Sequence, residues 1–175
     1  MRYPDKKIDT KRLALLGLSV SIALILSYIE FLLPPIFSAV PGIKLGLANI
    51  IIIYLLFALS AKDAAIVSIV RVILSSLLFG TALTLLYSLS GAVLSLAVMI
   101  ILKKADLFSK VGVSIAGAVM HNVGQILTAI AVLRTAEIGY YLIVLTLTGI
   151  LSGVFVGIAG ASLIKYIKIE WRTKK

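Results

Sequence analysis

Long apolar runs, separated by short polar or proline- and glycine-containing breaks, constrain this chain more than any other feature. An α-helix of about 20 apolar residues crosses the hydrocarbon core of a bilayer with its backbone hydrogen bonds satisfied internally. Hydrophobic residues make up 61% of the 175 positions and charged residues 14%, which is less charge than a soluble domain carries. The sequence therefore predicts an all-α integral membrane protein with a single transmembrane domain, residues 1–175.

Six such runs predict a bundle of six transmembrane helices. Prolines at positions 34, 35 and 41 separate the first two runs, because proline does not continue a helix. The other breaks are a turn at 61–63, a turn at Gly80 and Thr81, a basic loop at 103–110 and a segment at 134–139. The expected helices cover about 13–33, 43–59, 64–79, 82–102, 111–133 and 140–164, and a basic cytoplasmic tail follows at 165–175.

The basic residues predict the orientation of this bundle. The net charge is +10, but the Lys and Arg residues flank the apolar runs instead of forming a soluble basic face, so we expect no nucleic-acid partner. Six spans place both termini on one side of the membrane. That side carries fourteen of the 17 basic residues: Arg2, Lys6, Lys7, Lys11, Arg12, Lys62, Lys103, Lys104, Lys110, Lys165, Lys168, Arg172, Lys174 and Lys175. The positive-inside rule then predicts a multi-pass cell-membrane protein with both termini in the cytoplasm.

A cluster of polar residues lies in the middle of the fifth apolar run. It contains His121, Asn122 and Gln125, and His121 is the only histidine of the chain. The spacings of three and four residues place all three side chains on one side of a helix. Such a polar face is either a hydrogen-bonded contact between helices or the wall of a ligand pocket, and we favour the pocket.

Three charged residues and one asparagine add to this hypothesis. In the predicted orientation Glu30, Lys44, Asn49 and Arg71 all lie between the membrane midplane and the outer surface. Charges within spans normally face a partner or a wet cavity. Instead of lining a pocket, Lys44 could extend its amine to the membrane interface, and Glu30 could only neutralise the charge of Lys44 or Arg71. Arg71 is at least two helical turns from either end of its run, so it has no such access to the interface.

Small residues recur at four-residue spacing in two helices, and such ridges let helices approach closely. Gly149, Gly153 and Gly157 form one in the last helix; the first helix contains Gly17 with Ser21, and a second ridge that includes Ala23. These ridges either pack inside the chain or contact a second protein. In the fourth helix, Tyr87 stands beside a polar stripe and is a further candidate for the pocket wall.

Four sequence blocks resemble the membrane family called heptaprenyl diphosphate synthase component I, also described as Gx transporters. They read Pro-Gly-Ile-Lys-Leu-Gly-Leu-Ala-Asn at 41–49, Arg71 followed by Leu-Phe-Gly at 78–80, Tyr-Ser-Leu-Ser-Gly at 87–91, and Gly-Ala-Val-Met-His-Asn-Val-Gly-Gln at 117–125. The family is similar to the substrate-binding S components of energy-coupling factor (ECF) transporters, which are six-helix proteins with an outward pocket. The resemblance implies a bound solute, a separate transmembrane coupling protein and two ATPase subunits.

The sequence differs from these relatives in its first helix. It also lacks the residues that the enzymatic family name would require. Many S components contact the coupling protein through an Ala-x-x-x-Ala surface. Here the residue four positions after Ala14 is Leu18, so Gly17, Ser21 and Ala23 would have to form that surface instead. Prenyl elongation needs clustered aspartates that hold magnesium, and the four aspartates are isolated. We found no Walker loop, catalytic triad or metal-ligand spacing, and expect no enzymatic activity, cofactor or metal in this chain.

The sequence therefore favours the solute-binding subunit of an ECF-type uptake transporter, with a small polar or anionic solute in a cavity of the outer half. The alternative is a non-catalytic membrane partner of a soluble prenyl diphosphate synthase. A stand-alone carrier is a third possibility, without an inverted repeat to support it. The expected pocket residues are Glu30, Lys44, Asn49, Arg71, Tyr87, His121, Asn122 and Gln125.

Overall fold

The computed structural model describes residues 10–33 and 46–167 and is entirely helical in that part of the chain. This confirms the all-α prediction. The helices are α1 (Thr10–Leu32), α2 (Asn49–Ala58), α3 (Ala61–Phe79), α4 (Ala82–Ala105), α5 (Lys110–Leu133), the short 3₁₀ helix η1 (Ala136–Tyr140) and α6 (Tyr141–Tyr166).

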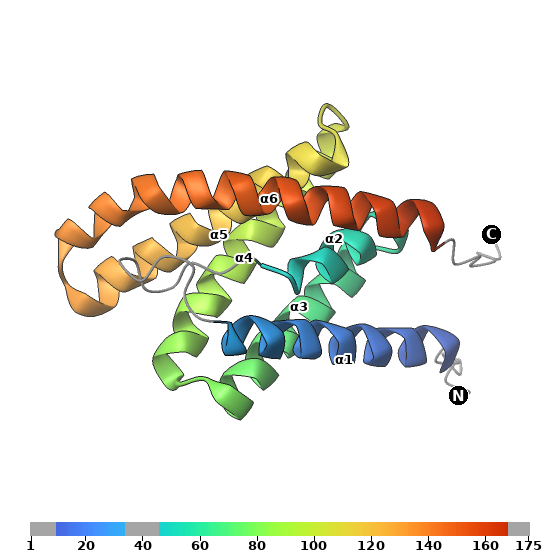
Figure 1. Cartoon of the computed structure of the whole chain (residues 1–175), viewed down its shortest axis with the longest axis horizontal. Coiled ribbons are helices and arrows are strands. Elements are labelled where there is room, and N and C mark those ends of the chain that lie inside the picture. The colour runs from blue at the N-terminus through green and yellow to red at the C-terminus, as the bar shows by residue number, and fades with distance from the viewer. Residues whose placement is uncertain (1–9, 34–45, 168–175) are drawn as a thin grey trace, which may run out of the picture.

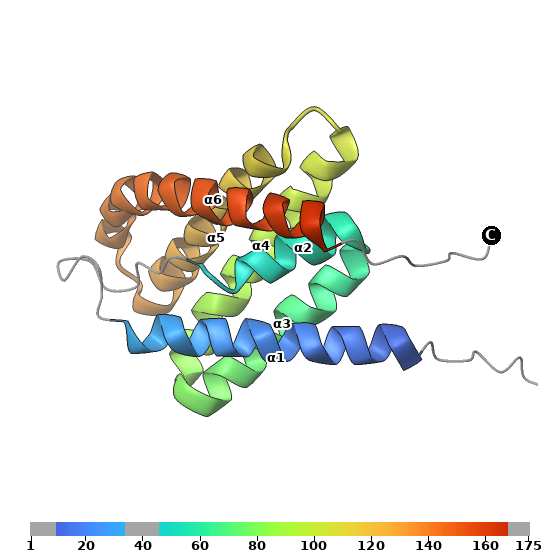
Figure 2. The same cartoon turned by 45° about the vertical axis from the view of Figure 1, so that its right-hand side comes forward.

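The helices form two packed groups that meet at α2 and at the contact between α3 and α4 (Figure 1). α5 packs along α4 on one side and α6 on the other, while α1 packs against α3. α2 contacts both α3 and α6, and its six consecutive residues Ile51 to Leu56 are all buried. The start of α1 and the end of α6 lie toward the same end of the molecule, and Figure 2 shows this from a second side.

α2 begins later than the sequence predicted. Residues 43–45 lie outside the described residues, and residues 46–48 form a turn in which the Asn49 amide donates to the Gly46 carbonyl oxygen at 2.8 Å. Gly46 has φ +72°, a left-handed conformation that glycine adopts without strain and that is incompatible with an α-helix. The predicted helix over 43–59 is therefore wrong at its start.

Two other predicted boundaries are shifted at helix caps, and α1 begins at Thr10 instead of 13. α3 begins at Ala61, not 64, because the Ser60 side chain accepts a hydrogen bond from the Asp63 amide and caps the helix. α4 extends to Ala105 and ends where Asp106 adopts a left-handed conformation. Before α6, the segment predicted as a connection contains η1. A serine at the N-cap stabilises the beginning of a helix, which apolar periodicity alone does not reveal.

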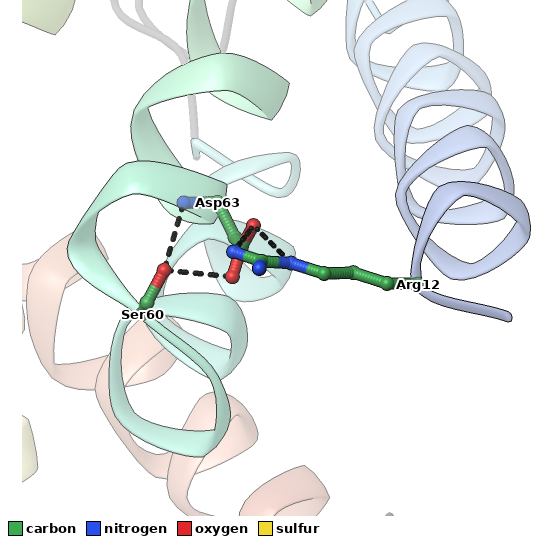
Figure 3. Close-up of polar contacts among 3 residues, drawn as sticks. All are labelled: Arg12, Ser60 and Asp63. Atoms are coloured by element: carbon green, nitrogen blue, oxygen red, sulfur yellow. Dashed lines mark hydrogen bonds and ion pairs between the residues drawn. The ribbon is translucent and has the colours of Figure 1, made fainter. Parts of the chain in front are cut away.

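An ion pair joins α1 to the α2–α3 turn. Arg12 donates to one carboxylate oxygen of the buried Asp63 from Nη2 at 2.7 Å and from Nε at 3.1 Å, and Ser60 donates to the other oxygen at 2.7 Å (Figure 3). The carboxylate is thereby satisfied although it is buried. Nearby, Lys103 of α4 donates to the Leu56 carbonyl oxygen at the end of α2. These contacts attach α1 to the beginning of α3, and α4 to the end of α2.

Glycines allow α4, α5 and α6 to pack with their backbones close together. A methyl group on Gly153 of α6 would lie 2.6 Å from the Ile115 Cα of α5, and one on Gly124 of α5 would lie 2.9 Å from the Gly91 Cα of α4. Gly149 and Gly157 also face α5. The small-residue ridge of the last helix therefore packs inside the chain. Gly17 of α1, in contrast, has no atom within 4 Å of an added methyl group.

Within the described residues, four helical segments are long and apolar enough to cross a membrane, which indicates a membrane protein. They are α1, α4, α5 and the continuous η1–α6 segment, Ala136–Tyr166. α2 is apolar but has only 10 residues, and α3 carries Lys62, Asp63 and Arg71 within its 19 residues.

Candidate functional site

A cavity of about 90 Å³ lies between the first five helices, and its wall is rich in polar side chains. Polar groups inside an apolar bundle are costly unless they bind one another, water or a ligand. The wall is formed by Ser27, Glu30, Asn49, Arg71, Ser75, Phe79, Ser88, His121, Asn122 and Gln125.

Of the two charged side chains in this wall, Arg71 has fewer hydrogen-bond partners than Glu30 among the described residues. Its Nη2 donates to the Asn49 side-chain oxygen at 3.2 Å, and its buried Nε has no hydrogen-bond acceptor among the described residues. The ion pair found among the described residues is that of Arg12 and Asp63, so Arg71 has no carboxylate within 4 Å there. A guanidinium has five donors in a planar fork, and here most of that capacity is directed at no protein acceptor in the described chain.

Glu30 reaches from α1 to the beginning of α2. Its carboxylate accepts hydrogen bonds from the backbone amides of Gly46 and Leu47, the latter at 3.4 Å. These amides precede the helix, where backbone donors lack intrahelical acceptors and a negative charge is favourable. Glu30 therefore shapes the turn that positions Asn49, in addition to lining the cavity.

The polar residues of α5 have two different surroundings. Asn122 donates to the Leu145 carbonyl oxygen of α6 at 2.6 Å, so it connects two helices while lining the cavity. The His121 ring lies against α4, where a methyl group on Gly91 would be 3.0 Å from both Cε1 and Nε2. Gln125 lines the cavity one turn further along α5. Of the two sequence-based interpretations of this cluster, the contact between helices is found at Asn122. All three side chains line the cavity, and its role as a ligand pocket stays a prediction.

The structure brings together six of the eight predicted pocket residues. Glu30, Asn49, Arg71, His121, Asn122 and Gln125 all line the one cavity. Lys44 lies outside the described residues. Tyr87 is not among the residues that form the wall, and its carbonyl oxygen accepts a hydrogen bond from Ser90 at 3.0 Å.

The prediction omitted four residues of the wall, and three of them had a detectable signal. Ser27 precedes Glu30 by three positions and Ser75 follows Arg71 by four, so each shares a helix face with a predicted residue. Ser88 belongs to the polar stripe of the fourth helix. Phe79 is apolar at the end of α3, and nothing in its local sequence distinguishes it from lipid-facing residues.

A smaller void of about 20 Å³ lies beside the cavity and shares Asn49 with it. It is lined by residues of α2, α4, α5 and α6 that include Ser95, Ser114 and Ser152. A void of this size with several polar neighbours suits a single buried water molecule. Among the described residues no group of three His, Cys, Asp or Glu side chains is placed to hold a metal ion.

Comparison with known proteins gives one match. A family model described as heptaprenyl diphosphate synthase component I matches residues 11–163. The comparisons with curated proteins and with solved structures found no match.

Proposed function

Since the chain belongs to the heptaprenyl diphosphate synthase component I family, we propose that it is a non-enzymatic, solute-binding membrane subunit similar to an ECF S component. In this proposal the cavity between α1 and α5 binds a small polar or anionic solute. The family description names a component of a synthase. In this proposal the residues around the cavity bind and orient a ligand and do not catalyse a reaction.

The incompletely paired guanidinium of Arg71 is the observation that carries the proposal. A cation that faces a cavity within an apolar bundle, with one neutral acceptor and an unsatisfied Nε, is energetically unfavourable. An anion in the cavity would supply the missing acceptors and remove part of this cost. The planar fork suits a carboxylate or a phosphate, which accepts two hydrogen bonds from it at once.

The other wall residues would fix the orientation of the solute through neutral hydrogen bonds. His121 and Gln125 line the cavity from α5, and Ser75 and Ser88 line it from α3 and α4. Glu30 and Asn49 hold the beginning of α2 and Arg71 in place. Lys44, from the sequence, is a second positive charge that we assign to the entrance.

We place all six helices within the bilayer, with both termini in the cytoplasm. α2 is only about 15 Å long, so it would cross about half of the hydrocarbon core, surrounded by the other helices. The basic residues at the described helix ends support this orientation. Lys11, Lys62, Lys103, Lys110 and Lys165 all belong to the predicted cytoplasmic side, whereas Arg134 lies opposite. The cavity then opens toward the outer half.

Transport would require a transmembrane coupling protein and two ATPase subunits, as the S-component resemblance implies. Gly17 and Ser21 lie exposed on α1 and remain our candidates for contact with the coupling protein, whereas the predicted Ala23 is buried in the core and is not available for this contact. The second candidate function is that of a non-catalytic membrane partner of a soluble prenyl diphosphate synthase, and the family description is equally consistent with it. Co-purification distinguishes them, because the first predicts recovery of ATPases and the second recovery of a soluble synthase.

The cavity is tested by replacing Arg71 with glutamine, which keeps two donors and removes the charge. Native mass spectrometry of the protein purified from membranes should show a bound small molecule with wild type and much less with Arg71→Gln. We expect an affinity loss on the order of 2 kcal/mol or more, typical of a desolvated charged hydrogen bond. Arg134→Gln, the same substitution at an exposed arginine outside the cavity, should retain the molecule.

Equal retention by folded wild type and Arg71→Gln would remove Arg71 from the site and contradict the anionic-solute proposal. Recovery of a soluble synthase without ATPases would replace the transport proposal with the second function.

A further inference from the structure

A second concavity adjoins the polar cavity on the outside of the bundle. It has a volume of about 360 Å³ and is lined by Leu24, Ile25, Tyr28, Leu78 and Phe79. These residues come from α1 and α3, and Ile25, Tyr28 and Leu78 are exposed by 59%, 48% and 70%. In a membrane-embedded bundle such apolar, exposed side chains face lipid tails.

The two concavities meet along the contact between α1 and α3. Phe79 lines both of them. On α1, Ser27 lines the polar cavity and the next residue, Tyr28, lines the groove. The polar and apolar surfaces thus border each other at Phe79.

Aromatic rings form the boundary between the two surfaces. The Phe79 ring centroid lies 5.3 Å from that of Phe31 and 5.7 Å from that of Tyr28. Tyr28 and Phe31 are in turn 6.5 Å apart. Aromatic side chains pivot about two dihedral angles, so a rotation of Phe79 changes the separation between cavity and groove without a helix displacement.

We propose that the ligand is an amphiphilic anion, with an acidic headgroup at Arg71 and an apolar chain in the groove between α1 and α3. This rests on the proposed function and specifies its substrate class. The incompletely paired Arg71 provides charge complementarity for the headgroup, and Phe79, which lines both concavities, is the boundary at which the chain would pass from the cavity to the groove. A purely polar solute would leave the groove to membrane lipid.

Three probes separate the contributions of headgroup and chain: geranyl diphosphate, inorganic diphosphate and geraniol. Their binding is measured by isothermal titration to the full chain in lipid nanodiscs. We expect geranyl diphosphate to bind at least tenfold more tightly than either fragment, because burial of an apolar chain adds to the ionic contact. Arg71→Gln should weaken both diphosphates by at least tenfold.

The groove is tested by Ile25→Trp, which fills it, and by Leu18→Trp as the matched control. Leu18 is seven residues earlier on the same face of α1, is 57% exposed, and does not line the groove. Ile25→Trp should weaken geranyl diphosphate at least fivefold and leave inorganic diphosphate unchanged. Leu18→Trp should change neither.

Two results would overturn the amphiphile while leaving the proposed function intact. One is equal affinity for inorganic and geranyl diphosphate, which means that the solute is polar only. The other is tight geraniol binding that Arg71→Gln does not affect, which means that the groove holds lipid chains independently of the cavity. Absence of binding by all three probes to the folded protein also overturns the inference, and the recovery of ATPases or of a synthase then decides the proposed function separately.

Discussion

The side-chain amide of Asn122 on α5 donates a 2.6 Å hydrogen bond to the backbone carbonyl oxygen of Leu145 on α6. Gly149 makes room for this contact, because a methyl group there would lie 2.9 Å from the Asn122 Nδ2. The same asparagine lines the polar cavity, so the cavity wall and the α5–α6 contact share one side chain.

Asn122→Leu should therefore lower the thermal stability of the protein, whereas Gln125→Leu should mainly reduce ligand retention. Leucine is close to asparagine in shape but cannot donate to Leu145, and a hydrogen bond between membrane helices is worth about 1 kcal/mol. Gln125 lines the same cavity one turn away. Thermal unfolding in detergent measures the first effect and native mass spectrometry the second. An unchanged melting temperature for Asn122→Leu would contradict the structural role of this bond.

Gly153→Ala should destabilise the bundle, because its methyl group would meet the α5 backbone at 2.6 Å from the Ile115 Cα. The expected cost is about 1–3 kcal/mol, the range for overpacking a well-packed interior. Gly17→Ala is the matched control, since nothing lies within 4 Å of its added methyl group. Chemical or thermal unfolding should separate the two variants, and equal stability would show that α5 and α6 are not in contact at Gly153.

The ion pair of Arg12 and Asp63 should contribute to the attachment of α1. We expect Arg12→Gln and Asp63→Asn each to lower stability, and a double-mutant cycle to give a coupling of about 1 kcal/mol. The value is modest because half of the Arg12 side chain is exposed, although Asp63 is buried. Lys62→Gln, an exposed neighbour of Asp63, is the control and should leave stability unchanged. A coupling of zero would mean that Ser60 alone satisfies the Asp63 carboxylate.

The predicted orientation can be tested by cysteine labelling, because the chain contains no cysteine of its own. A cysteine in Ser109→Cys should resist a membrane-impermeant thiol reagent in intact cells, and one in Glu137→Cys should react. Both positions are exposed and lie at opposite ends of α5. Permeabilised cells provide the control, in which both must react. Labelling of the Ser109→Cys variant from outside would reverse the topology and place the cavity in the cytoplasmic half.

The sequence alone was sufficient for the helical class, the family and most of the cavity wall. Apolar runs are a local property, and in a bilayer they have few alternatives to a helix. The same constraint makes buried polar residues rare, and for that reason Glu30, Asn49, Arg71 and the α5 cluster were recognisable before their positions in space were known. The family match over residues 11–163 confirms the resemblance found from four short blocks.

Only the tertiary structure decided which polar residue contacts which, because hydrogen bonds between helices depend on their relative rotation and depth. Periodicity places Asn122 and Gln125 on one face, yet only the approach of α6 at Gly149 makes Asn122 a helix contact. The late start of α2 depends on the left-handed Gly46 and on Glu30, sixteen positions away in the chain. Phe79 likewise becomes a wall of both the cavity and the groove only because α1 packs beside α3.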